Sequence, residues 1–461
     1  MNPHSPGRTP WFVPALLWMG VSLFGRSARA APPLDAAPPA GDGAGVADDR
    51  SLTAPVLERA AFVQVVLRRN PSLASARQAW RAAVARTRRS GVLDDPRIEG
   101  GLAPLSIGSS TVRAGWEATV SQRLPWPGKL GLDEAVARAE ADAARSDLEA
   151  SRRELALTAA LLFDDYFVDA RSIEINAHHV TLMRSMQAAA TAQVAAGRGS
   201  AQDPLRAEFE LTQMERDAFV LASRRDVTVA QMNELLHRAP EAALPPPPAE
   251  LTVAPAPGVA DARRLEAEAV DRRPDIAAAR EHGRAAQARA DRGSRESFPD
   301  FTVSTTYNAM WDTPEHRWMV GLAVDLPIPN GRRAGAVDEA DATRAQYEAD
   351  AARLSDAART QVVVALARLE EAGHVLRLMD ERLLPIARDE VDAARAAFTV
   401  SQAPFVAVVE AEKNLRGVEL ERQMAIADDD RRRADLDHAL GRIPGLGQVD
   451  GAASRIDGGT P

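Results

Sequence analysis

Two stretches of the chain alternate between apolar and polar or small residues. In the first, the apolar positions are Val112, Ala114, Trp116, Ala118 and Val120. WMVGLAVDL, at 318–326, repeats the alternation. A period of two predicts strands with one apolar face. With the segment before each, the pattern predicts two hairpins, with strands at about 96–107 and 111–124 and at about 299–311 and 316–327.

Elsewhere apolar residues recur every seven positions, which predicts long helices that pack side by side. One such series is Ala159, Tyr166, Ile173 and Val180. No proline or glycine interrupts residues 132–196, so a continuous helix of about 65 residues would be on the order of 100 Å long. A second long helical run is predicted over 333–398 from the repeat. Both runs exceed the dimensions of a globular domain.

The sequence repeats itself at an offset of about 203 residues. RRNPSLASAR, at 68–77, resembles DRRPDIAAAR, at 271–280, and the heptad series returns as Val362, Leu369, Leu376 and Leu383. Each repeat is predicted to contain a helix, two strands, a very long helix and a shorter helix. The repeats cover 55–237 and 264–440. The predicted fold is therefore mostly α with a small β part.

Four further segments flank these repeats. Residues 1–30 have the features of a cleaved secretory signal peptide, with an apolar run that is too short to span a bilayer. Residues 31–54 and 441–461 lack periodicity and are expected to be flexible. The proline-rich linker at 238–263 cannot continue a helix.

Composition narrows the possible functions. The formal net charge is -9 with both signs interspersed, which argues against a nucleic-acid partner. The chain has no cysteine, so it forms no disulfide and carries no lipid on cysteine. No nucleophile triad, phosphate loop or zinc motif occurs in it, which predicts no enzyme, no cofactor and no metal site.

The strands suit a lipid environment, although a soluble sheet with one buried face would show the same alternation. Their length is that of tilted membrane strands, and tryptophans suit the membrane interface: Trp116, Trp126, Trp311 and Trp318. Four strands cannot close on themselves, so several chains must combine. Each hairpin ends at a corner that turns the chain into a helix, at Pro125, Pro127 and Gly128 and again at Pro327 and Pro329.

The corner sequences LPWPGKL and LPIPNGR, together with the signal peptide and the duplicated halves, resemble the TolC-like outer-membrane efflux protein family over residues 55–440. The resemblance implies a homotrimer with a twelve-stranded barrel in the outer membrane of a Gram-negative bacterium, continued by an α-helical barrel in the periplasm. It also implies a passive exit duct for metal ions or drugs. Its partners would be a periplasmic adaptor and an inner-membrane transporter of the resistance-nodulation-division type. A protein-secretion duct of type I and a periplasmic coiled-coil scaffold are the alternatives.

The resemblance also suggests functional residues at the two helix tips. Acidic side chains narrow the periplasmic end in the family, and Asp203 and Glu410 stand at matching positions, where they would attract cations. Alternatively, Asp203 only favours the start of the returning helix. Residues expected to shape the tips or contact the adaptor are Gly199, Pro204, Phe405 and Val409. The chain departs from the family pattern at Ala403 and Ala407, which puts a salt-bridge gate in doubt.

Three potential soft metal ligands share one helix face. His179, Met183 and Met186 lie at helical spacing, which would suit a copper or silver relay. Such residues on one face are often incidental, and neighbouring His178 points about 100° away. They are not included in the predicted site.

Overall fold

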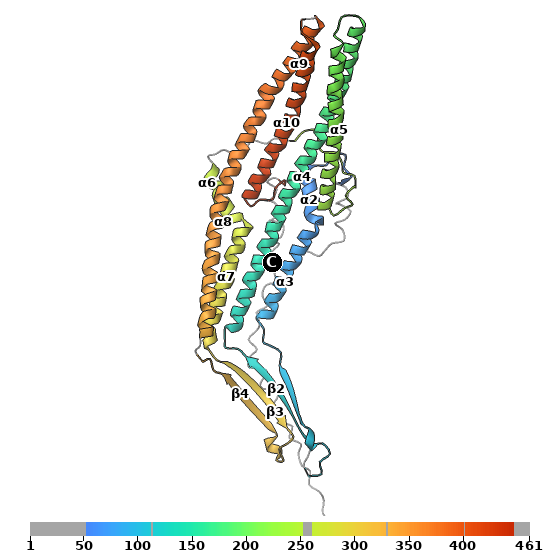
Figure 1. Cartoon of the computed structure of the whole chain (residues 1–461). Coiled ribbons are helices and arrows are strands. Elements are labelled where there is room, and N and C mark those ends of the chain that lie inside the picture. Colours follow the sequence, from blue (N-terminus) through green and yellow to red (C-terminus); the bar gives the residue numbers. More distant parts are fainter. Residues whose placement is uncertain (1–51, 112–113, 252–260, 329–330, 401, 447–461) are drawn as a thin grey trace, which may run out of the picture. The chain divides into compact units, whose positions relative to one another are not determined.

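The computed structural model describes residues 52–111, 114–251, 261–328, 331–400 and 402–446, and helices form most of this part (Figure 1). The signal peptide predicted at 1–30 lies outside the described residues. The helices are α2 (Arg59–Arg69), α3 (Pro71–Ser90), α4 (Lys129–Ala195), α5 (Gln202–Leu235), α6 (Ala262–Arg272), α7 (Pro274–Ser294), α8 (Gly331–Leu378), α9 (Leu384–Thr399) and α10 (Phe405–Ala439). Among the described helices, none combines the length and apolarity that crossing a membrane requires.

The four strands form one antiparallel sheet in the order β1, β2, β3, β4. Their bounds are β1 (Arg97–Ala103), β2 (Gly115–Leu124), β3 (Asp300–Asn308) and β4 (Trp318–Asp325). They are shorter than the alternation predicted. β1 ends early because Pro104 starts a 3-10 turn. β2 and β3 belong to different repeats, so their pairing joins the two halves of the chain.

A helix break recurs at the same place in both repeats. Between α2 and α3, Asn70 is extended and its side chain accepts the Ser72 amide at 2.9 Å, while Pro71 needs no amide partner. Between α6 and α7, Arg273 is extended and Pro274 starts the next helix. The repeat seen in the sequence therefore extends to the backbone.

The helices that end the two repeats, α5 and α10, stop in the same way. The Arg238 amide donates to the Asn233 carbonyl at 2.9 Å, and the Arg442 amide donates to the Asp437 carbonyl at 2.8 Å. In each turn the preceding residue is left-handed, with φ of 54° at His237 and 70° at Gly441. Glycine adopts this conformation without steric cost, whereas histidine does not.

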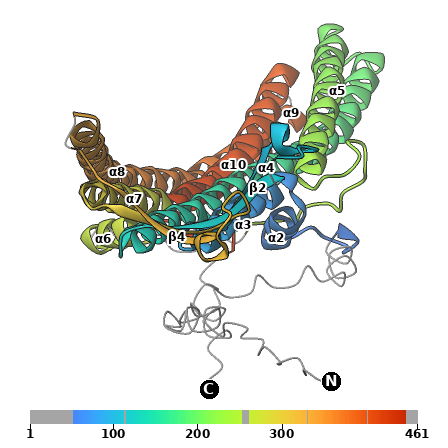
Figure 2. The same cartoon turned by 90° about the horizontal axis from the view of Figure 1, so that it is seen from below.

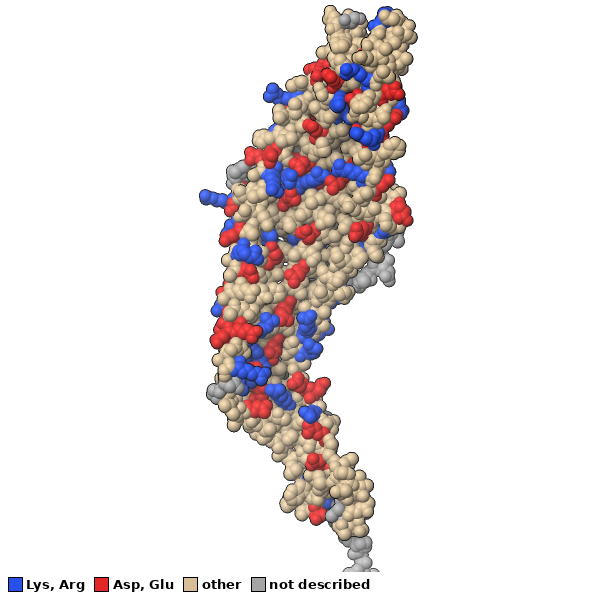
Figure 3. Space-filling view, in the orientation of Figure 1, with Lys and Arg blue, Asp and Glu red and all other residues tan. Residues whose placement is uncertain are grey.

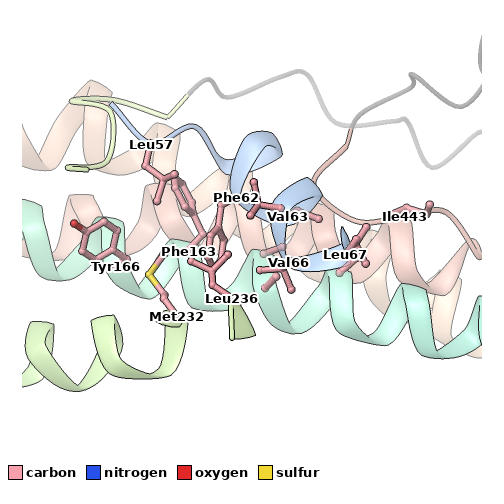
Figure 4. Packing of buried hydrophobic residues seen from close by; sticks show 14 of the residues in the cluster. Leu57, Phe62, Val63, Val66, Leu67, Phe163, Tyr166, Met232, Leu236 and Ile443 are labelled. Atoms are coloured by element: carbon pink, nitrogen blue, oxygen red, sulfur yellow. The ribbon is translucent and has the colours of Figure 1, made fainter. Parts of the chain in front are cut away.

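The largest buried cluster lies where α2, α4 and α5 meet (Figure 4). Its centre is aromatic: Phe62 and Phe163 are fully buried, with ring centroids 6.4 Å apart. Chain outside the predicted repeats also packs here, since Leu52 and Ile443 are buried and the linker residue Leu244 is partly buried. The described parts of the segments expected to be flexible are therefore packed against the first repeat.

The corresponding cluster of the second repeat is aliphatic. It lies where α6, α8 and α10 meet. Its largest members are Leu265, Ile276, Leu366, Leu369, Leu436 and Leu440, with alanines between them. Both clusters bury the helix faces that the heptad pattern marked as apolar.

The second long helix is interrupted. A π-helical turn, Met379–Leu383, separates α8 from α9. Pro385 lies two residues beyond it and has no amide, so the carbonyl of Glu381 loses its usual α-helical partner. A π turn is a common response to such a defect. The long helix predicted over 333–398 therefore contains a π turn that the sequence analysis did not predict.

The π turn also ends the heptad series. Val362, Leu369 and Leu376 are buried as predicted, whereas Leu383 is 37% exposed. One extra residue in a helical turn rotates all later side chains about the helix axis. Beyond the turn burial moves to the next position, Leu384, and recurs seven residues later at Val391.

Four helices stand side by side next to the sheet (Figure 2): α3 packs on α4, α4 on α7, and α7 on α8. Away from the sheet, α4 pairs with α5 and α9 pairs with α10. The turns that join these pairs form two tips at the end opposite the strands (Figure 1). The sheet and the tips are therefore the two ends of the helical body.

Candidate functional site

One face of the sheet is apolar across all four strands. The register aligns apolar positions, so that Ile98 lies opposite Val120 and Tyr307 lies opposite Trp318. Ile98 is 76% exposed and Val320 is 83% exposed, although such side chains are normally buried. The large apolar residues of this face are Ile98, Leu102, Trp116, Val120, Val303, Tyr307, Trp318, Val320, Leu322 and Val324. A contiguous apolar surface of this kind marks a contact with a partner or a membrane.

Aromatic side chains lie at both ends of this face. At the end far from the helices, the Tyr307 ring lies 5.1 Å from Trp116 and 5.2 Å from Trp318. At the helix end, Trp126 stacks on Phe298 at 5.2 Å and on Phe301 at 6.0 Å. Tyr307 lies six positions after Phe301 along β3, a distance of about 20 Å. This spacing is close to the height of the apolar band of membrane barrels.

Trp311 differs from the other three predicted interface tryptophans. It lies beyond the end of β3, in the connection to β4, with its ring 5.7 Å from His316. It is 48% exposed. The prediction placed it at the end of a strand, and the shorter β3 leaves it in the loop.

The opposite face of the sheet is polar and internally hydrogen-bonded. The hydroxyls of Thr119 and Thr306 lie 2.8 Å apart, and the Asn308 amide donates to Glu117 at 3.1 Å. Charged residues of both signs are interspersed over the helical body, and they are sparse on the part of the sheet that Figure 3 shows. A sheet with one apolar and one polar face can separate lipid from water.

The first corner is closed by a buried ion pair that the sequence analysis missed. Lys129, at the start of α4, is buried, and its Nζ lies 2.7 Å from Asp300 Oδ1 and 3.0 Å from the Phe298 carbonyl. The Trp126 amide donates to the same carboxylate oxygen at 2.9 Å. The lysine is visible in LPWPGKL, but its partner is 171 positions away. Only the fold brings them together.

Three predicted corner residues surround this ion pair. Pro125 and Pro127 lie in the short connection from β2 to α4, and Pro127 begins its turn. Gly128 has a φ of 91°, and a side chain there would collide with the guanidinium of Arg295. The left-handed conformation therefore favours glycine at this position, and Arg295 would have to move to admit a side chain.

The second corner differs from the first. Pro327 follows β4, and Ile328, which replaces Trp126 in the repeat, is 75% exposed. Pro329 lies outside the described residues. Asp325, the last residue of β4, is exposed and forms no ion pair within the described part of the chain.

Two glycines lie at the first tip, the predicted Gly199 and also Gly197. Gly197 has a φ of 70°, and the next amide closes the end of α4 on the Gln193 carbonyl at 2.9 Å. Gly199 is needed for space, since a Cβ there would lie 3.2 Å from the Val194 amide nitrogen. Asp203 accepts the Ser200 amide at 3.2 Å in the first turn of α5. Asp203 thus has a structural task.

Pro204 follows directly and lies in the first turn of α5. Amides in this turn have no partner within the helix, so the missing amide of proline costs nothing there. Its place agrees with the predicted role in shaping the tip.

The second tip buries its predicted residues. Phe405 is 2% exposed and Val409 is 5% exposed, and both pack with Met183 and Met214 from α4 and α5. The Phe405 ring also lies 5.5 Å from that of Phe398. These residues hold the two hairpins together. Because Phe405 and Val409 are buried within the chain, they offer little surface to a partner.

A groove of about 500 Å³ separates α5 from α10 beside the tips. Leu205 and Phe209 line it and are 64% and 63% exposed. Glu410 lies on its α10 side, and Lys413 reaches Glu210 across it at 3.6 Å. The sequence analysis missed the two apolar residues, although their spacing of four places them on one face of α5.

The potential metal ligands are already engaged. His179 is 2% exposed and lies 3.0 Å from Glu419, and this hydrogen bond holds the pKa of Glu419 below its ordinary value. Met183 belongs to the core of the tips. Within the described residues, no group of three or more histidine or carboxylate side chains could hold a metal ion.

The second half of the chain matches a known family. Residues 265–442, which are most of the second repeat, match the family described as outer membrane efflux protein. No curated protein matches the sequence significantly.

The fold is that of solved outer-membrane channels. CusC, studied for its folding and transmembrane channel formation, has a TM-score of 0.72 at 17% identity, with 84% of this chain and 92% of CusC covered. The MtrE outer membrane channel of Neisseria gonorrhoeae, in its open state, has a TM-score of 0.70 at 18% identity, with 84% and 89% covered. VceC of Vibrio cholerae has a TM-score of 0.69 at 17% identity, with 83% and 95% covered.

Proposed function

We propose that this chain, which has the fold of TolC-like outer-membrane channels and matches the outer membrane efflux protein family over residues 265–442, is the exit duct of a tripartite efflux pump. The two-faced sheet is the observation that carries the proposal. Its outer edges, on β1 and β4, are unpaired among the described residues. Unpaired edges are costly in hydrocarbon, so several copies must pool their strands. Three copies would give the twelve strands that the resemblance implies.

Conduction through such a duct needs no chemistry from the protein. The apolar face of the sheet would contact outer-membrane lipid, and the polar face with Thr119, Thr306 and Glu117 would line a water-filled passage. The helices would continue this passage through the periplasm. An inner-membrane transporter, of the resistance-nodulation-division type, would supply the energy for metal ions or drugs to pass. Export of the chain itself would use the signal peptide at 1–30.

The tips would meet the periplasmic adaptor. Leu205 and Phe209 offer exposed apolar surface there, unlike the buried Phe405 and Val409. Glu410 is exposed and is the better candidate for a cation-attracting ring, because the Asp203 carboxylate is already bonded to the Ser200 amide.

The test is conductance of the purified full-length protein in planar lipid bilayers. We expect discrete channels that prefer cations. Replacing Asp203 by Asn and Glu410 by Gln together should reduce the reversal potential in a salt gradient, whereas Glu208→Gln on the exposed side of α5 should not. A protein that stays water-soluble and never conducts would support the coiled-coil scaffold instead. Conductance with an unchanged reversal potential would remove the two carboxylates from the constriction.

A further inference from the structure

The pairing of β2 with β3, called the inner joint below, shows how strands of the two repeats meet in the sheet. β2 ends the hairpin of the first repeat, and it pairs with β3, which begins the hairpin of the second. β4 and β1 hold the corresponding positions at the outer edges of the sheet. The β2–β3 joint is therefore a template for β4 of one copy against β1 of another.

In the template, an ion pair lies next to the corner. Arg123 Nη2, at the end of β2, lies 3.0 Å from Asp300 Oδ2, at the start of β3. The register sets Arg123 opposite Thr302 and Leu124 opposite Phe301. The pair thus crosses the joint on a diagonal, on the polar face.

The repeat places the same two charges, with their signs exchanged, at the outer edges. Arg123 directly precedes Leu-Pro at the first corner, and Asp325 directly precedes Leu-Pro at the second. Asp300 directly follows Pro299, and Arg97 directly follows Pro96. We call the pairing of β4 with β1 of another copy the outer joint. Where the inner joint has Arg123 and Asp300, the outer joint has Asp325 and Arg97.

Both outer charges lack a cross-strand partner of opposite sign within the described chain. Asp325 lies opposite Asp300 in the sheet, and Asp300 is already neutralised by Lys129 and Arg123. The Arg97 side chain is 76% exposed, and its ion pair, at 2.6 Å, is with Glu99 of its own strand. A second copy would bring the arginine to the aspartate.

The template also gives a register for the outer joint. In the repeat, Leu124 corresponds to Leu326 and Phe301 corresponds to Ile98. The Leu124–Phe301 pair therefore sets Leu326 opposite Ile98 of the second copy. Leu322 then lies opposite Leu102, so the apolar face continues across the joint without a step. A shift by one residue would turn all apolar side chains of one strand to the polar face.

We propose that β4 pairs antiparallel with β1 of a second copy with Leu322 opposite Leu102, and that Asp325 and Arg97 form the sign-exchanged counterpart of the Arg123–Asp300 pair. The inference rests on the proposed function, which requires several copies to complete the sheet. The backbone ladder and the apolar face hold the joint. The ion pair selects the register, because an exposed pair contributes little affinity whereas facing like charges oppose wrong pairings.

Cysteine cross-linking tests the register. The chain has no cysteine, so Leu322→Cys with Leu102→Cys introduces the only thiols. Two strands separate these positions within one copy, about 14 Å in all, so an internal disulfide is excluded. Mild oxidation of the protein in membranes should give covalently linked copies on denaturing gels. The control pair, Leu322→Cys with Ile98→Cys, lies about 13 Å out of register and should give none.

Equal linkage of the control pair would overturn the proposed register. Failure of the matched pair to link in a protein that still conducts in bilayers would overturn it too, while leaving the duct intact. A protein that neither conducts nor multimerises would refute the proposed function and the register together.

Charge exchange tests the ion pair. Asp325→Arg and Arg97→Asp alone should each raise the fraction of dissociated copies about threefold on heating in mild detergent, because like charges then face each other. Both changes together should restore the original dissociation. Asp312→Arg, on the loop between β3 and β4, should have no effect. Single variants that assemble like the parent, or a double variant that dissociates as readily as the single ones, would overturn the pair.

Discussion

The two repeats fill the same backbone with different side chains. Phe62 and Phe163 of the first core correspond to Leu265 and Leu366 of the second, and all four are buried. The aromatic core also receives Leu52, Ile443 and the linker, which have no counterpart around the aliphatic one. The larger aromatic side chains thus occur in the core that also packs segments from outside the repeats.

The same comparison holds for charge. In the first repeat, Arg59 lies 3.1 Å from Asp164 and 2.8 Å from Asp430. Alanine occupies the positions of Arg59 and Asp164 in the second repeat, at 262 and 367. Burial raises the pKa of Asp164 well above its ordinary value, against the lowering effect of Arg59. Duplication has conserved the geometry of the core while its chemistry has diverged.

The largest expected effect comes from emptying each core at the same position. Phe163→Ala should lower the free energy of unfolding by about 3–5 kcal/mol and Leu366→Ala by about 2–4 kcal/mol, because the larger side chain leaves the larger cavity. Urea unfolding followed by circular dichroism in detergent would measure both. An equal or greater loss for Leu366→Ala would show that the aromatic core is not the stronger one.

The two helix ends should respond in opposite directions. Gly441→Ala should cost about 1–3 kcal/mol, because φ is positive and the new Cβ would lie 3.0 Å from the Arg272 carbonyl group. His237→Gly should stabilise by up to about 1 kcal/mol, since it relieves the same strain. Thermal melting would measure both changes.

Gly417→Ala serves as the control for this pair. Gly417 lies within α10 with open space around its Cα, so alanine should stabilise the helix by about 1 kcal/mol. If Gly441→Ala caused no more loss of thermal stability than Gly417→Ala, the left-handed turn would not require glycine.

The smallest effect concerns pH. Because the folded-state pKa of Asp164 is raised, its stabilising contribution is fully present below about pH 4 and is lost as the pH rises through the folded pKa. The advantage of the parent over Asp164→Asn should therefore shrink with rising pH, at no more than about 1.4 kcal/mol per pH unit. Asp147→Asn, on the exposed side of α4, should run parallel to the parent. A constant difference for Asp164→Asn would mean that the residue does not titrate.

The strands and the duplication could be predicted because their signals are local. Alternation set the faces of β2 and β4. The break between α2 and α3 was not predicted, although Pro71 lies at it and Pro274 lies at its counterpart. The Lys129–Asp300 pair could not be predicted, because it joins residues that only the completed sheet brings together. The burial of Phe405 likewise depends on α4 and α5. The roles of Asp203 and Glu410 at a constriction stay predictions.

The π turn at Met379–Leu383 carries a consequence for the second tip. Removing one residue there would restore an α-helical turn and rotate everything beyond it by about 100° around the shaft. The direction in which α9 presents its faces is thus adjustable by a single insertion or deletion, without repacking the base. The length of this one turn therefore sets the rotation of the second tip about the axis of α8.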